Sequence, residues 1–202
     1  NLYVNSVKSW TTNIFAATNG GVFLSVNNGT SWVDKNSGLT NLTIRALYVN
    51  GTELFAGTEG GVFYSSNSGT NWTVKNSGLT NTAVYSIIIA GINLYAGTYG
   101  GGVFKSTNNA SNWTAVNSGL GNKYVTGLSS NVLGTYIFAS TFEGVYMTSN
   151  NGSNWVNKNQ GFATESGVNR VLVTTTNVYA GTQGESVWKR NYTETIGIEN
   201  IS

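Results

Sequence analysis

One short phrase occurs four times in this chain at nearly constant spacing, and it constrains the fold more than any other feature. The copies read SVNNGTSW, SSNSGTNW, STNNASNW and TSNNGSNW, and they open at Ser25, Ser65, Ser106 and Thr148. A period of about 40 residues indicates repeated supersecondary units, because one such unit cannot bury its apolar face alone. We therefore expect one body built from stacked repeats.

The residues between two copies predict four short strands. In the repeat at 42–81, a β-branched and aromatic run ends at Asn50-Gly51, which is a strong hairpin signal. Further strands are expected near 53–58, 61–66 and 71–76, separated by turns that contain Gly. Four antiparallel strands in one repeat of this length are typical of a β-propeller blade. The continuous apolar run at 86–90 fits an inner strand that is buried on both faces.

A second motif, IFAAT, LFAGT, LYAGT, IFAST and VYAGT, occurs five times. The sequence therefore predicts an all-β, five-bladed β-propeller in a single domain, 1–202. The approximate blades are 1–40, 41–80, 81–121, 122–163 and 164–202. The last blade lacks the Asn-Gly-Trp phrase and places Ile196 about where Trp would stand, as terminal repeats often do. The simplest closure packs the fifth blade on the first. The alternative is a fragment of a ring of six to eight blades, whose two free apolar faces would cause aggregation or dimerisation.

The repeated phrase has a structural interpretation at the turn between the third and fourth strands. Its Asn residues are expected to accept a hydrogen bond from the backbone N–H two residues on. Its Gly residues are expected to adopt a positive φ, and Ala110 breaks this pattern of glycines in the third copy. Its Trp residues are expected to open the fourth strand and to bury their rings. The Asn and Trp positions are Asn27, Trp32, Asn67, Trp72, Asn108, Trp113, Asn150 and Trp155.

This phrase resembles the Asp-box (BNR) repeat of sialidases, sortilin-type receptors, xyloglucanases and the photosystem II assembly propeller. The chain carries Asn where that box usually has Asp, and Asn can make the same turn. In that family the box is a structural hairpin, so the resemblance implies a structural role here. The end of the chain, VWKR followed by IENIS, resembles the ends of Asp-box propellers in secreted bacterial multi-repeat proteins. That resemblance implies an extracellular or cell-surface location.

Composition argues against an enzyme. The chain contains no His and no Cys, so it has neither an imidazole base nor a thiolate nucleophile. It has three Arg residues and one Asp, too few for a sialidase-like site. Glu59, Glu143 and Glu185 share one turn of different blades, but Glu143 is one place out of register, so a Glu pair for glycoside hydrolysis is not favoured. The sequence shows no metal-binding loop, and we expect no metal and no cofactor.

Charge and hydropathy restrict the partners. The net charge is +2 and no basic run exceeds Lys189-Arg190, which argues against nucleic acid. No apolar run is long enough for membrane insertion. Lys35, Lys75 and Lys158 recur in the outermost strand, where an edge lysine discourages pairing with another chain. We expect a monomer whose partner is a protein or a glycan.

The positions that differ between blades predict where a ligand binds. Strand parity puts the second-to-third turn and the inter-blade loop on the face opposite the boxes. Aligned positions there read Asn19, Glu59, Tyr99, Phe142, Gln183 and Asn5, Arg45, Tyr85, Thr126, Asn169. Divergence on a rigid scaffold is where function tends to lie. The predicted ligand-binding residues are Arg45, Glu59, Tyr85, Tyr99, Phe142, Asn169 and Gln183.

The sequence thus predicts a non-enzymatic extracellular recognition or scaffold module that binds through this face. Two alternatives stay open. One is a carbohydrate-binding lectin, because sugars suit sites of aromatic rings and amides. The other is a non-catalytic or truncated propeller of the glycosidase type.

Overall fold

The structure is a computed structural model that describes residues 3–160, 167–184 and 186–196. Within that part the chain is almost entirely β. Four successive blades have four strands each, and the fifth has three strands and a short helix. The strands of the first two blades are β1 (Val4–Trp10), β2 (Asn13–Thr18), β3 (Gly21–Ser25), β4 (Val33–Asp34), β5 (Ile44–Asn50), β6 (Glu53–Thr58), β7 (Gly61–Ser65) and β8 (Thr73–Val74). Those of the next two are β9 (Val84–Ala90), β10 (Asn93–Thr98), β11 (Gly102–Ser106), β12 (Thr114–Ala115), β13 (Val125–Ser130), β14 (Ile137–Thr141), β15 (Gly144–Thr148) and β16 (Val156–Asn157). The fifth blade contains β17 (Val168–Val173), β18 (Asn177–Thr182), β19 (Val187–Asn191) and α1 (Tyr192–Ile196).

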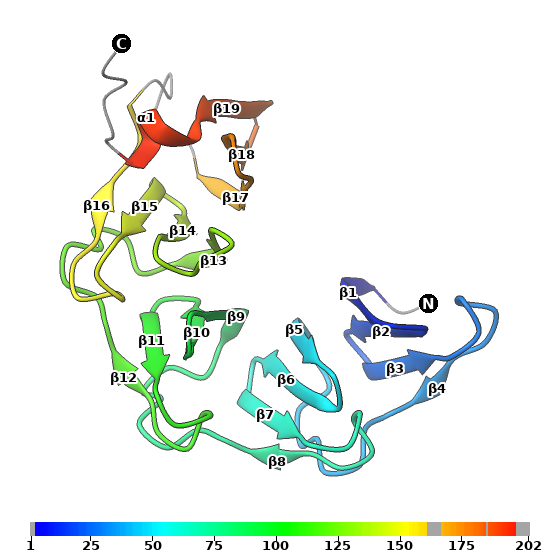
Figure 1. Cartoon of the computed structure of the whole chain (residues 1–202). Helices are drawn as coiled ribbons and strands as arrows, with labels where there is room; N and C mark the ends of the chain where they lie inside the picture. Colours follow the sequence, from blue (N-terminus) through cyan, green and yellow to red (C-terminus); the bar gives the residue numbers. More distant parts are fainter. Residues whose placement is uncertain (1–2, 161–166, 185, 197–202) are drawn as a thin grey trace.

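Each blade is an antiparallel meander in which every strand pairs with the next strand along the chain. The blades follow one another along an arc, with β1, β5, β9, β13 and β17 on its inner side (Figure 1). Each inner strand contacts the inner strand of the next blade. The first three strands begin and end close to where the sequence predicts them, whereas the fourth is only two residues long.

The expected closure of the fifth blade on the first is not seen. In Figure 1 the arc is open, and β1 and β17 lie at its two ends. The apolar side chains on these end blades face solvent: Val7 is 56% exposed and Val187 is 65% exposed. The described residues therefore form five blades of an open arc.

The apolar core lies between blades, and the Trp residues of the repeated phrase hold its outer part. Trp72 packs with Phe15 and Val22 of the first blade and with Leu47 of its own blade. Its indole Nε1 donates to the backbone carbonyl of Lys35, in the preceding blade, at 2.8 Å. Trp113 and Trp155 make the same bond to the carbonyls of Lys75 and Val116. Each of these Trp residues therefore fastens its own blade to the one before it.

Trp32 is the exception to the prediction that these rings are buried. Its side chain belongs to the first blade, and no blade precedes it in the structure. The residue is 41% exposed, against 4% for Trp72, and its Nε1 donates to the carbonyl of Gly29 in its own loop at 3.2 Å. The missing neighbour, rather than the local sequence, explains the difference.

The turn chemistry of the phrase is confirmed in part. Asn67 Oδ1 accepts a bond from the backbone N–H of Asn71, four residues on, and not from the residue two positions on. The buried hydroxyl of Ser65 accepts the backbone N–H of Gly69 and donates to Asn67 Oδ1. The other three copies repeat this pattern. The predicted positive φ is found at Gly69, +80°, and also at Ala110, +61°.

The end of the fifth blade differs from the others, as the absence of the phrase indicates. The residues after β19 form the helix α1, and Ile196 packs partly buried against the core between the fourth and fifth blades. Ile196 thus contributes to the core that a Trp fills at the earlier junctions, although from a helix.

Candidate functional site

The positions that vary between blades lie together because each inner strand carries a β-bulge at its start. The ladder skips one residue there: Ile44 pairs with Thr58 and Ala46 pairs with Gly57, which leaves Arg45 unpaired. The skipped residues of all five blades are Asn5, Arg45, Tyr85, Thr126 and Asn169. A bulge redirects its side chain away from the regular pleat, so these side chains need not follow the alternation of the strand.

The bulged residue contacts the residue that follows the second strand, fourteen positions later, in four of the blades. Asn5 donates to Asn19 at 2.8 Å, and Arg45 Nε donates to Glu59 at 3.0 Å. Tyr85 stacks on Tyr99, and Gln183 donates to Asn169 at 3.1 Å. The two variable positions therefore lie side by side in four of the five blades. We call the row of these residues the rim.

An aromatic cluster occupies the middle of the rim. The rings of Tyr85 and Tyr99 stack with centroids 5.1 Å apart. Tyr99 meets both Tyr124 and Phe142 edge-on, at 5.0 and 5.6 Å, and these last two rings are nearly parallel. Tyr99 is 39% exposed and Tyr124 is 44% exposed. The cluster therefore presents aromatic surface to solvent although its rings hold one another in place.

A charged pair flanks the cluster on the side of the second blade. Arg45 donates to Glu59 through both Nε and Nη2. The guanidinium also lies over the ring of Tyr85, 5.3 Å from its centroid. The ion pair is part-exposed and contributes little to stability, but it fixes the direction of the arginine beside the ring.

A hollow opens on the other side of the cluster. It has a volume of about 430 Å³ and is lined by Tyr85, Tyr99, Thr126, Phe142, Asn169, Arg170 and Gln183. Burial lowers the pKa of the Arg170 guanidinium, whose Nη1 donates to the carbonyl of Asn169. The hollow thus combines aromatic walls, two side-chain amides and one arginine.

All seven residues that the sequence predicts for a ligand site lie on the rim, and five of them line this hollow. Three further residues were missing from that prediction: Tyr124, Thr126 and Arg170. Thr126 is itself a bulged residue, and Arg170 directly follows the bulged Asn169. Tyr124 lies in the loop before β13, so an aromatic residue in an inter-blade loop was the signal available for it.

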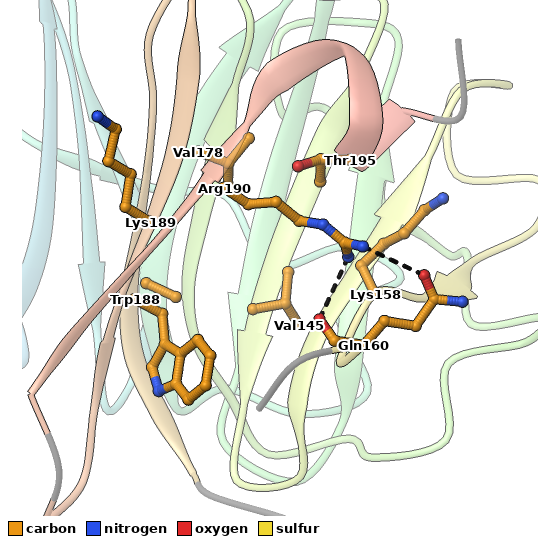
Figure 2. Close-up of a pocket in the computed structure, with 9 residues that line it drawn as sticks. Val145, Lys158, Gln160, Val178, Trp188, Lys189, Arg190 and Thr195 are labelled. Carbon is orange, nitrogen blue, oxygen red and sulfur yellow. Dashed lines mark hydrogen bonds between the residues drawn. The ribbon is translucent and has the colours of Figure 1, made fainter. Parts of the chain in front are cut away.

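A second hollow lies at the junction of the fourth and fifth blades, away from the predicted site (Figure 2). Its volume is about 290 Å³, and Val145, Val178 and Trp188 supply apolar walls. Arg190 occupies the strand position that Ser65 has in the second blade. Its guanidinium reaches across to Gln160, with donor–acceptor distances of 3.3 and 3.4 Å. The hollow therefore lies where the fifth blade, which lacks the Trp of the repeated phrase, meets its predecessor.

The charges around this second hollow are positive. Lys158, Lys189 and Arg190 line it, and burial together with the charge of Arg190 lowers the pKa of Lys158. Lys158 is the counterpart of Lys35 and Lys75, whose carbonyls bind the Trp rings. These three residues directly follow the outermost strands β4, β8 and β16, rather than lying in them as the sequence predicts, and they line the blade junctions.

The described residues offer little for acid–base or metal chemistry. No group of three His, Cys, Asp or Glu side chains in that part could hold a metal ion. Glu59 is paired with Arg45, and Glu185 lies outside the described residues. Nor does any helix within the described ranges have the length and apolarity needed to cross a membrane.

Comparisons with known proteins support the fold. No family model matches the chain, and no curated protein matches it. Among solved structures, an ancestral GH74 enzyme is similar over 98% of this chain and 30% of its own, with a TM-score of 0.79 and 20% identity. The extracellular domain of a one-component system from B. thetaiotaomicron is similar over 95% of this chain and 27% of its own, with a TM-score of 0.78 and 18% identity. YCF48 bound to D1 peptide is similar over 100% of this chain and 69% of its own, with a TM-score of 0.66 and 12% identity.

These identities are low, so the likeness concerns the fold alone. The chain has the β-propeller fold. It spans only about 30% of the length of the first structures it matches. The activity of those proteins is therefore not a property shown for this one.

Proposed function

We propose that this chain is a non-enzymatic recognition module that binds a protein or glycan ligand through the rim. The observation that carries the proposal is the exposed aromatic cluster of Tyr85, Tyr99, Tyr124 and Phe142 beside the hollow. Aromatic and arginine side chains are enriched among residues that dominate binding energy, because they bury large areas and keep a polar handle. The rings already contact one another, so little side-chain entropy is lost when a ligand covers them.

A carbohydrate is the second candidate, and a specific observation favours it. Asn169 and Gln183 bond to each other beside the aromatic walls of the hollow. Such amides can exchange their mutual bond for bonds to sugar hydroxyls, while a ring packs on the apolar face of the sugar. The third candidate, a non-catalytic or truncated propeller of the glycosidase type, is supported by the similarity to GH74 structures.

We also propose an extracellular or cell-surface location. It is supported by the similarity to extracellular domains of sensor proteins from B. thetaiotaomicron.

Two screens on the full chain test the proposed function. A glycan array and a displayed peptide library identify the ligand class. Tyr99→Ala removes the ring that contacts three other rings, and we expect it to weaken binding at least tenfold, about 1.4 kcal/mol. Lys35→Ala and Lys75→Ala, away from the rim, are the controls and should leave affinity unchanged.

The opposite pattern would place the site elsewhere. If the lysine substitutions abolish binding and Tyr99→Ala has no effect, the rim is not the ligand site. A panel of fluorogenic glycosides tests the non-enzymatic assignment, and turnover that is lost in Glu59→Gln would overturn it.

A further inference from the structure

The three junctions between the first four blades are made by the same two surfaces. The second blade serves as the example. Its front face, which packs on the first blade, consists of Ile44, Leu47 and Trp72. Its back face, which packs on the third blade, consists of Phe55, Gly57 and Val62. At the junctions inside the arc these side chains are 4% exposed or less.

A knob and a notch define the fit of the two faces. The first residue of the inner strand is the knob, and in the second and third blades a glycine of the second strand is the notch that receives the knob of the following blade. A Cβ placed on Gly57 would lie 2.7 Å from Val84 Cγ1, and one on Gly97 would lie 2.6 Å from Val125 Cγ1. Ala17 and Ser140 stand at this position in the first and fourth blades, so a glycine notch is occupied at the two junctions that have one.

The first blade carries a complete front face that no other described blade covers. Val4, Val7 and Trp32 stand at the positions of Ile44, Leu47 and Trp72. They are 57%, 56% and 41% exposed, against 0%, 2% and 4% for their counterparts. The free knob is Val4.

The fifth blade carries the matching free back face. Tyr179, Gly181 and Val187 stand at the positions of Phe55, Gly57 and Val62. Val187 is 65% exposed, and a Cβ on Gly181 would meet only the carbonyl oxygen of Arg170, at 4.0 Å. An open hollow of about 460 Å³ lies on this face and is lined in part by Tyr179, Gly181 and Val187. The free notch is Gly181.

We propose that the two free faces bind each other between copies of the chain, so that the first blade of one copy packs head to tail on the fifth blade of another. The two faces cannot meet within one copy, because they lie at the two ends of an open arc (Figure 1). They continue the interface that the chain already forms between its own blades, with Val4 entering the notch at Gly181. This proposal differs from the monomer that we expected from the sequence.

Such an interface is heterologous, because each copy contributes a different surface. Burying the front face would return Val4, Val7 and Trp32 to the surroundings of their counterparts, and a Trp side chain alone removes roughly 150–250 Å² from water. Sedimentation velocity and light scattering of the full chain should therefore show a mass that rises with concentration.

Two substitutions block one face each. Val4→Asp puts a charge on the knob, and Gly181→Leu fills the notch. Both positions are open to solvent or free space in one copy, so the fold should be unaffected, which circular dichroism checks. We expect each variant alone to be monomeric. Ile92→Asp, at a residue that is 95% exposed in a turn, is the matched control and should associate like the unmodified chain.

Mixing the two variants is the decisive measurement. The Val4→Asp variant keeps its back face and the Gly181→Leu variant keeps its front face, so an equimolar mixture should form a dimer and nothing larger. The proposal is overturned if the unmodified chain stays monomeric at the highest concentration reached. It is equally overturned if association survives either substitution alone, or if the mixture does not dimerise.

Discussion

Replacing Trp72 and Trp32 by alanine compares the same residue of the same motif with and without a neighbouring blade. Trp72 is 4% exposed, packs between two blades and donates to the Lys35 carbonyl. Deleting a buried aromatic ring of this kind costs about 3–5 kcal/mol. The carbonyl left without its donor adds to this, so we expect a value near the upper end of that range. Trp32 is 41% exposed and bonds within its own loop, so Trp32→Ala should cost about 1 kcal/mol.

The assay is denaturant unfolding of the full chain, followed by far-ultraviolet circular dichroism so that loss of a fluorophore does not matter. The protein is kept dilute, so that contacts between copies do not stabilise Trp32. Stability of domains is about 5–15 kcal/mol, so the two variants should be easy to separate. Equal loss of stability would refute the reasoning, because it would show that the ring acts within its own hairpin and not at the junction.

Three further outcomes are expected. Asn67→Ala removes an acceptor of two hydrogen bonds in the turn and should cost about 1–2 kcal/mol in the same denaturant assay, less than Trp72→Ala; a larger loss would reverse the assigned roles. Gly57→Ala should destabilise the chain, because its Cβ would lie 2.7 Å from Val84 Cγ1, whereas Gly181→Ala meets open space and should be neutral by thermal melting. Burial raises the pKa of Tyr48, Tyr95 and Tyr192 above the ordinary 10.0, so the unfolded chain loses these protons first. Stability should therefore be full below about pH 10 and should fall as the pH rises through the folded-state pKa values, with little change around neutrality because the chain has no His. The lowered pKa values of Lys158 and Arg170 act in the opposite direction. A stability that increases above pH 10 in urea titrations would contradict the dominance of the Tyr residues.

The repeat made the blades predictable, because strand lengths and turns depend on local sequence and the same local pattern occurs in each copy. The first three strands of the second blade, Ile44–Asn50, Glu53–Thr58 and Gly61–Ser65, are close to the predicted ranges. The rim was predictable for a related reason. When the scaffold is identical between copies, a position that varies is free of scaffold duties, and that pointed to Arg45, Tyr85 and Tyr99.

What the sequence did not reveal depends on neighbours that are far apart in the chain. The phrase around Trp32 is the same as the one around Trp72, yet only a preceding blade decides which ring is buried. The reach of Asn67 to the residue four positions on depends on the backbone path through Ser68 and Gly69, both at positive φ. The bulge that turns Arg45 toward the rim is a property of strand pairing, which no local pattern states.

The tryptophan that fastens each blade to its predecessor gives the chain a direction of assembly. During synthesis from the N-terminus, the carbonyl of Lys35 leaves the ribosome before Trp72, and that of Lys75 before Trp113. When the second, third and fourth blades are synthesised, the carbonyl that accepts the bond from each Trp ring has therefore already left the ribosome. The bonds that join adjacent blades span 37 to 39 residues, so each blade contacts only its immediate neighbours along the chain. The protein can therefore grow one blade at a time, each finished blade serving as the template for the next.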